Sequence, residues 1–316
     1  MNQNWDQQTQ RDCAGESANV PTVNDSSSSP KLEDIGTEKD CDTNSRFQNL
    51  DWHASGGLGV IYRARDAELR RDVALKFLRD RALGGSESAA TFENEARITA
   101  QLGHPGVVPI YGIGKTVDGG RPFYAMRFIE GRKLSQVISE FHEEDRRHSR
   151  RLDAQSSEFR KLLTRMVFVC STVQYAHHRG VIHLDIKPDN VMVGQFDETL
   201  LVDWGLATKV NRDEMRQHPI FTSIDSGVSD LNSDGPKSSG EGPGTPAYFS
   251  PEQAFRDAEL TFATDIYLLG ATLYHVLTGV APLSDATSRF DALLRAREGE
   301  FHKPSEIRPG IPRELE

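Results

Sequence analysis

The chain changes character near residue 131, where strand-like sequence gives way to helical sequence. Before this point, short segments rich in β-branched and aromatic residues alternate with Gly-containing turns. The strand-like segments are Val60–Tyr62, Val73–Leu78, Val107–Ile113 and Pro122–Ile129, with one helical pattern, Ala89–Leu102, among them. After this point, apolar residues recur at helical spacing. The helical segments are Leu134–Phe141, Phe159–His177 and Thr264–Thr278. This segregation predicts an α+β fold with a strand-rich first lobe and a helical second lobe.

Charge and cysteine content narrow the class of protein. The net charge of −10 argues against a nucleic-acid partner or an anionic membrane, because both require a basic surface. The sequence contains no uninterrupted apolar run of about 18 residues, so no membrane-spanning segment is expected. The three scattered cysteines, Cys13, Cys41 and Cys170, form neither a disulfide framework nor a zinc spacing. We therefore expect a cytoplasmic protein.

Two polar segments are expected to lie outside the folded core. Residues 1–45 carry nine acids against three bases, and we interpret them as a disordered acidic tail. Glu143–Arg151 is interpreted as a solvated, charged insertion. Docking of a partner on either segment is the alternative.

A Gly-rich turn precedes the strand-like segment at Val60. Glycines there allow backbone N–H groups to approach phosphate oxygens without a side chain intervening. The turn consists of Ser55, Gly56, Gly57, Leu58, Gly59 and Val60. By itself the signal is weak, because many Gly-rich turns bind nothing.

Lys76 strengthens the interpretation of the Gly-rich turn as a phosphate-binding loop. It occupies the middle of Val73–Leu78, where an ammonium group without a partner is unfavourable. Glu95, in the following helical segment, is a candidate anionic partner. The alternative is a lysine whose stem carries its charge out to solvent.

The most informative segment is His183–Asn190, followed by Leu201–Gly205. Asp185, Asn190 and Asp203 supply two carboxylates and an amide, which are oxygen ligands suited to Mg²⁺. A carboxylate left free of metal can accept a proton from an attacking hydroxyl. Individually such residues are more often caps or turns, but the ordered set is improbable by chance.

From about Phe47 onward, these motifs together resemble the eukaryotic-type protein kinases, in particular the bacterial serine/threonine branch. The resemblance implies the two-lobe protein kinase fold over residues 46–316. It places the strand-rich lobe at 46–131 and the helical lobe at 132–316. It also implies ATP and Mg²⁺ as ligands, and proteins with serine or threonine hydroxyls as substrates.

The resemblance assigns roles position by position. Asp185 matches the catalytic base, Lys187 a lysine that contacts the transferred phosphate, and Lys76 the strand lysine on the α- and β-phosphates, also counted as catalytic. The magnesium ligands would be Asn190 and Asp203. The residues implied in nucleotide binding are Ser55, Gly56, Gly57, Leu58, Gly59, Val60, Ala74, Lys76, Glu95, Met126, Phe128, Asn190 and Asp203. The residues Arg127–Glu130 would form the hinge that binds adenine through backbone groups.

Two positions set the implied substrate class. Lys187, two residues after the base, and Thr245, in the substrate-facing loop, follow the serine/threonine pattern. Asp265 resembles the helix aspartate that anchors the catalytic loop. We expect transfer of the γ-phosphate of Mg·ATP to protein serine or threonine, possible self-modification included. The alternatives are a truncated, inactive kinase-like scaffold and a small-molecule phosphotransferase.

Several positions depart from the family pattern. Leu184 replaces an arginine that would pair with a phosphorylated activation segment, so we expect activity without that modification. Thr99 stands where an apolar residue usually packs toward His183 and Trp204. The sequence after Phe290–Gly299 also predicts a helical lobe without its last helices, and with uncovered apolar surface.

Overall fold

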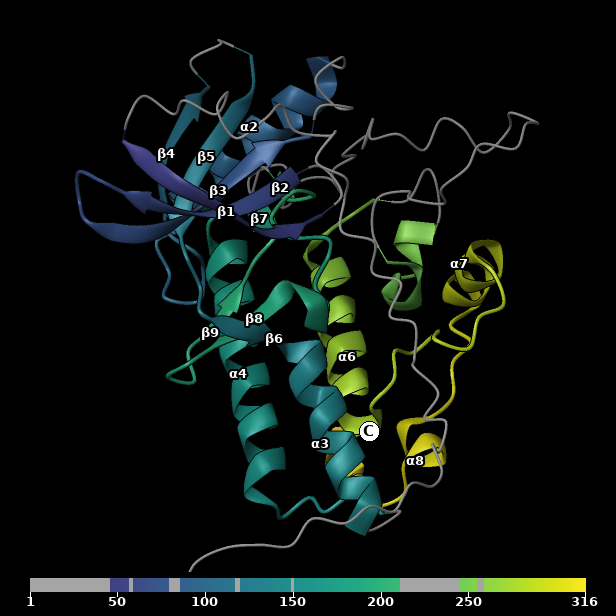
Figure 1. Ribbon diagram of the computed structural model, residues 1–316. Coiled ribbons are helices and arrows are strands. Elements are labelled where there is room, and N and C mark those ends of the chain that lie inside the picture. Colours follow the sequence, from purple (N-terminus) through teal and green to yellow (C-terminus); the bar gives the residue numbers. More distant parts are fainter. Residues whose placement is uncertain are drawn as a thin grey trace, which may run out of the picture.

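The computed structural model describes residues 46–56, 59–79, 86–116, 120–148, 151–210, 245–254 and 259–316. Two lobes are stacked one above the other (Figure 1). The predicted acidic tail and the middle of the activation segment lie outside the described residues. Among the described residues, no helix is long and apolar enough to cross a membrane.

A five-stranded antiparallel sheet forms the first lobe. The strands, in spatial order, are β1 (Phe47–Ser55), β2 (Gly59–Asp66), β3 (Arg71–Leu78), β5 (Pro122–Arg127) and β4 (Ile110–Lys115). The helix α2 (Ser86–Gln101) packs against β4 and β5 on one face of this sheet. The antiparallel order allows short connections between neighbouring strands.

The side-chain alternation of β3 divides the first lobe into two cores. Val73, Leu75 and Phe77 contribute to one core, together with residues of β2 and β5. Because successive side chains of a strand point to opposite faces, Lys76 and Leu78 lie on the other face. Leu78 packs there with residues of α2. The two-residue period therefore directs Lys76 toward helix α2.

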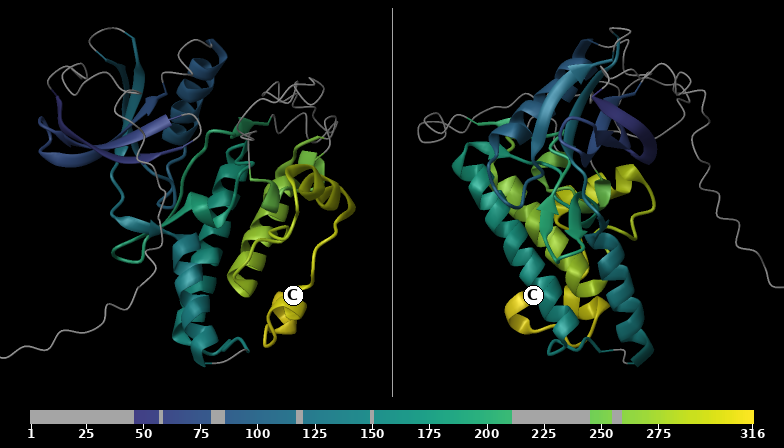
Figure 2. Two further views of the ribbon diagram at one scale, coloured as in Figure 1. Left: turned by 45° about the vertical axis from the view of Figure 1, so that its right-hand side comes forward. Right: turned by 60° about the vertical axis from the view of Figure 1, so that its left-hand side comes forward.

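Three long helices form the second lobe: α3 (Leu134–His148), α4 (Ser157–His178) and α6 (Phe262–Thr278). They run alongside one another, as Figures 1 and 2 show, and bury a shared apolar core. Local signals set the ends of α6. Thr261 and Thr264 form a capping box at its start, and Gly279 ends it at φ 82°, in the left-handed region that favours glycine.

Smaller elements complete the helical lobe. They are the sheet of β6 (Gly131–Lys133), β8 (Val191–Gly194) and β9 (Thr199–Leu201), the pair β7 (Val181–Ile182) and β10 (Thr208–Lys209), the helices α7 (Arg289–Glu298) and α8 (Pro304–Ile307), and the 3-10 turns η2 (Pro188–Asn190), η3 (Pro246–Tyr248), η4 (Glu252–Ala254) and η5 (Arg313–Leu315). The small sheets hold the loops that face the first lobe.

The predicted division into a strand-rich and a helical lobe is confirmed, with shifted boundaries. The expected strand Val107–Ile113 begins only at Ile110, because Val107 instead bridges to Leu201 in the second lobe. The expected strand Pro122–Ile129 ends at Arg127. Tertiary pairing, which local propensity does not report, sets both limits.

The interpretation of Glu143–Arg151 as a solvated insertion was wrong in part. Residues 143–148 continue helix α3, and Glu144 is exposed as expected. Asp145, however, forms an ion pair with the buried Arg308, far along the chain. The burial of this carboxylate depends on a partner that the local charge pattern does not reveal.

Several apolar side chains of α6 and α7 are exposed to solvent. Their exposed fractions are 76% for Phe290, 41% for Leu294 and 58% for Ile266. Ile311 and Leu315 pack instead against the cluster around Leu152. Apolar side chains are therefore exposed on α6 and α7, while the uncovered apolar surface expected of a shortened helical lobe stays a prediction.

Candidate active site between the two lobes

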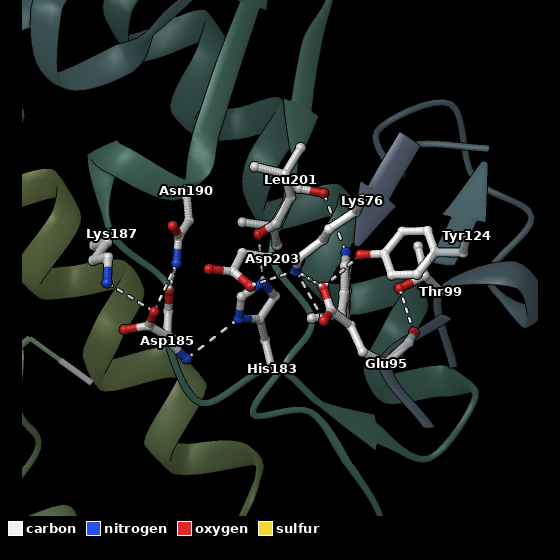
Figure 3. Close-up of polar contacts among 12 residues, drawn as sticks. Lys76, Glu95, Thr99, Tyr124, His183, Asp185, Lys187, Asn190, Leu201 and Asp203 are labelled. Atoms are coloured by element: carbon white, nitrogen blue, oxygen red, sulfur yellow. Dashed lines mark hydrogen bonds and ion pairs between the residues drawn. The ribbon is translucent and has the colours of Figure 1, made fainter. Parts of the chain in front are cut away.

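A buried ion pair joins β3 to α2. Lys76 Nζ lies 2.7 and 2.9 Å from the two carboxylate oxygens of Glu95 (Figure 3). The Tyr124 hydroxyl on β5 donates to Glu95 Oε1 at 2.9 Å. Gly59 lies beside this pair, where any larger residue would be crowded, because a Cβ at this position would lie only 2.8 Å from Lys76 Cε. The close approach of the Gly-rich turn to Lys76 therefore requires a glycine.

Lys76 also faces the second lobe. Its Nζ lies 3.8 Å from Asp203 Oδ1, in the segment that follows β9. Burial by itself would lower the pKa of Lys76, but Glu95, Tyr124 and Asp203 together outweigh it, and the pKa is raised well above the ordinary lysine value. Lys76 is therefore a permanent cation at the junction of the lobes.

A buried carboxylate of α6 holds the loop after β7. Asp265 accepts the backbone N–H of His183 at 2.8 Å and that of Leu184 at 2.9 Å. His177 on α4 lies 2.7 Å from the same carboxylate. The capping box at the start of α6 directs Asp265 into this position. A rigid helix thus orients the loop that carries Asp185.

Asp185 and three polar residues form the cluster on the helical-lobe side. Lys187 Nζ donates to Asp185 Oδ2 at 2.8 Å and to Thr245 Oγ1 at 2.7 Å. Asn190 Nδ2 donates to the Asp185 carbonyl and to Asp185 Oδ2, both at 2.8 Å. Because its nitrogen is engaged, the amide oxygen of Asn190 is the atom left for another ligand.

The two aspartates differ in their electrostatic setting. Burial raises the pKa of Asp185, although Lys187 partly offsets the rise. Burial would also raise the pKa of Asp203, but Lys76, His183 and Lys187 together lower it below its ordinary value. One carboxylate is therefore held as a stronger base and the other as a firmly ionised group, the arrangement that separates proton acceptor from cation ligand.

Two non-glycine residues of the site have left-handed backbone conformations, Leu184 at φ 67° and Asp203 at φ 64°. Such conformations cost on the order of 1 kcal/mol each, so the surroundings must fix them. Leu184 is held by Asp265 and by Gln253, whose side-chain amide donates to the Leu184 carbonyl at 2.9 Å. The candidate site therefore contains two strained backbone positions, one in each of its two loops.

Leu184 packs in an apolar cluster instead of presenting a charge. Its neighbours are Ile182, Leu206, Val210, Leu260 and Phe262. Val210 belongs to the start of the activation segment, and Leu260 follows its end. The cluster therefore holds the described start of that segment, by apolar contact, against the residues at the start of α6.

The remaining predicted residues line the first-lobe side. Ser55 pairs with Val60 across the Gly-rich turn, and Ala74 on β3 pairs with Met126 on β5. Phe128 follows β5 in the hinge. Gly56 lies in the same turn, whereas Gly57 and Leu58 lie outside the described residues.

Thr99 does not supply the contact that an apolar residue at its position would make with His183 and Trp204. Its hydroxyl donates to the Glu95 carbonyl at 2.7 Å, within its own helix. His183 and Trp204 contact each other instead, with tilted rings whose centroids lie 4.5 Å apart. The backbone bond satisfies the buried hydroxyl of Thr99, which is 4% exposed.

Sequence reasoning missed three residues of the site. Tyr124 stabilises Glu95, His177 contacts Asp265, and Gln253 fixes Leu184. Tyr124 was detectable in part, because it lies two residues before Met126 and so shares its strand face. His177 and Gln253 gave no such signal, because their partners are remote in the sequence.

The chain matches the protein kinase domain family over residues 54–309. It is 34% identical over 241 residues to the serine/threonine-protein kinase PknD of Protochlamydia amoebophila, covering 76% of this chain and 24% of the relative. It is 35% identical over 234 residues to PknD of Chlamydia muridarum, covering 74% and 24% respectively. It is 36% identical over 234 residues to PknD of Chlamydia felis, with the same two coverages.

The chain therefore belongs to the protein kinase domain family, and these relatives are bacterial serine/threonine-protein kinases. This confirms the predicted family and its two-lobe α+β fold. The chain spans about a quarter of the length of the curated relatives it matches.

Proposed function

We propose that this domain transfers the γ-phosphate of ATP to serine or threonine hydroxyls of proteins. The carrying observation is the joint presence of the Lys76–Glu95–Asp203 contacts on one side and the Asp185–Lys187–Thr245 contacts on the other. The first set presents a fixed cation to phosphate oxygens, and the second presents a base. Positioning and charge stabilisation are the main requirements of phosphoryl transfer.

Each side chain would act from its observed place. Lys76 would hold the α- and β-phosphates, and Asp185 would orient the attacking hydroxyl and accept its proton. Lys187 would neutralise charge on the transferred group, while its bond to Thr245 links it to the substrate loop. The hinge and the Gly-rich turn, with Ala74 and Met126 between them, would enclose the nucleotide.

Asn190 and Asp203 fit a magnesium site by donor chemistry. Asp203 offers an ionised carboxylate and Asn190 its free amide oxygen, both ligands that Mg²⁺ accepts. When bound, Mg²⁺ would screen the negative charge of the phosphates. Among the described residues, no cluster of three or more His, Cys, Asp or Glu competes as a metal site.

We further propose the wider organisation predicted from the sequence. The domain would extend from about residue 46 through both lobes, with residues 1–45 as an acidic tail. The net charge of −10 supports proteins over nucleic acid as partners. The few scattered cysteines support a reducing, cytoplasmic setting.

Phosphate transfer from Mg·ATP to the chain itself and to a generic basic protein tests this function. Labelled serine or threonine is expected with the parent protein, located by mass spectrometry, and is expected to be lost with Asp203→Ala. A folded parent that binds Mg·ATP but transfers nothing would refute the proposal and favour a nucleotide-holding scaffold. Circular dichroism identifies unfolded samples, which are excluded.

A further inference from the structure

The turn between β8 and β9 is fixed to the helical lobe and to the hinge. Gln195 N donates to the Glu130 carbonyl of the hinge at 3.1 Å. Arg165 on α4 pairs with Asp197 at 2.7 Å, and Asp197 has a left-handed backbone with φ 61°. The turn is therefore a defined platform at the edge of the second lobe.

From this platform Glu198 reaches the first lobe. Its Oε1 accepts from Arg127 Nη2 at 2.7 Å, and its Oε2 accepts the Phe196 N–H at 3.1 Å. A Cβ at Gly194 would lie 2.2 Å from Glu198 Cδ, so only glycine leaves room for the carboxylate. The placement of Glu198 is thus specified by its own turn before it meets Arg127.

Arg127 belongs to the first lobe by its backbone. It is the last residue of β5, it pairs with Val73 of β3, and its N–H donates to the Pro109 carbonyl at 3.0 Å. The ion pair with Glu198 therefore crosses from one lobe to the other beside the hinge. With side-chain exposures of 43% and 29%, it remains accessible to solvent and can break and re-form.

The first lobe also contacts the hinge. Arg63 of β2 lies over the Phe128 ring, 4.9 Å from its centroid, and lies 3.6 Å from the Glu130 carboxylate. The His53 ring of β1 meets Phe128 edge-on at 5.0 Å. The hinge is consequently held between side chains of both lobes.

We propose that Arg127 and Glu198 are positioning residues for the nucleotide. Their pair sets the rotation of the lobes about the hinge, and so places the hinge backbone relative to Lys76. This inference rests on the proposed function, in which the hinge binds adenine and Lys76 the phosphates. A small rotation would misplace one end of the nucleotide while leaving the base Asp185, which belongs wholly to the second lobe, undisturbed.

The test is a double-mutant cycle of Arg127→Gln and Glu198→Gln, with KM for ATP and kcat measured separately. Glu198→Gln keeps an acceptor for Phe196 N, so the turn is preserved. Each single variant is expected to raise KM for ATP about two- to fivefold, with kcat little changed. The double variant is expected to match the larger single effect, and Arg127→Lys to restore the parent value.

Glu140→Gln is the matched control. It breaks the exposed pair between Arg132 and Glu140, which lies within the second lobe, and should leave KM for ATP unchanged. Independent, additive effects of the two glutamine variants would overturn the proposal. A coupling seen in the melting temperature but absent from KM for ATP would also overturn it, because it would show a purely structural pair.

Calorimetric titration with Mg·ATP separates this inference from the proposed function. If the parent binds Mg·ATP but transfers no phosphate, the kinase proposal fails, while the same cycle in Kd still decides the role of the pair. Coupled losses of affinity would support positioning, and uncoupled losses would overturn it. A folded parent that does not bind Mg·ATP would overturn both.

Discussion

Two buried ion pairs of this protein have similar chemistry and different surroundings. Lys76 and Glu95, called the cleft pair below, join strand β3 to helix α2 where the two lobes meet. Arg308 and Asp145, called the basal pair below, join the residue after α8 to helix α3 at the base of the helical lobe. The side chains of both pairs are no more than 12% exposed.

The pairs differ in how many other partners they have. Glu95 also accepts from Tyr124, and Lys76 also faces Asp203, whose side chain is 53% exposed. Among the described residues, the Nε of Arg308 has no hydrogen-bond partner. Because an unpaired buried charge is costly, the basal pair should matter more for stability and the cleft pair more for chemistry.

The largest expected effect is that of Lys76→Met on activity. Removing the cation should lower kcat about 100- to 1,000-fold, the range typical of losing one transition-state stabilising group. Tyr124 would still donate to Glu95, so the protein should stay folded. Phosphate-transfer kinetics and urea unfolding measure the two effects, and a stability loss larger than that of Arg308→Met would contradict the comparison.

Arg308→Met should reverse this pattern. The substitution leaves Asp145 buried without its partner and should lower the free energy of unfolding by about 3–5 kcal/mol. The activity per folded molecule should not change, because neither residue contacts the cleft cluster. Arg132→Met, at an exposed pair, is the control and should cost less than about 1 kcal/mol. Equal losses of unfolding free energy in Arg308→Met and Arg132→Met would show that burial does not make the basal pair more stabilising than an exposed pair.

A half-buried histidine, His275, should make the helical lobe sensitive to acid. His275 Nδ1 lies 2.5 Å from the Tyr248 hydroxyl, and burial lowers the pKa of His275 to about 4. Between about pH 6.5 and 4 the unfolded state binds a proton that the folded state does not, so stability falls as the pH falls through this window.

The expected contribution of His275 is about 1–3 kcal/mol, and His275→Gln should flatten the pH dependence of unfolding by that amount. The measurement is urea unfolding at pH 4.5 and 7, with His302→Gln, at an exposed position, as control. An unchanged slope in His275→Gln would remove His275 from the account. The cost of burying charge would then be evident only at the Lys76–Glu95 and Arg308–Asp145 pairs.

The smallest effect should come from the activation segment. Replacing every serine and threonine from Thr222 to Ser239 with alanine should change kcat by no more than about twofold. Leu184 cannot pair with a phosphate, and its apolar cluster already holds the described start of the segment. Loss of activity in the folded variant would mean that the cleft pair needs a phosphorylated segment after all.

Much of this arrangement follows from the sequence alone. The two-residue period of β3 dictates that Lys76 leaves the face of Val73 and Leu75, whatever the lobes do later. The order of Asp185, Asn190 and Asp203, with the resemblance to protein kinases, led to the prediction of a phosphate-transfer cluster, and its assignment stays a prediction. Short-range geometry supports such predictions, because neighbouring positions on one strand or loop can face only a few directions.

Only the tertiary structure decided the remaining partners. Tyr124 beside Glu95, Arg308 on Asp145 and Glu198 on Arg127 each join positions separated by tens to more than a hundred residues. Their pairing depends on how whole elements pack. The sequence therefore determined which groups are candidates for the chemistry, and the packing of the two lobes decided which other groups hold them, because burial and charge pairing arise only when distant segments meet.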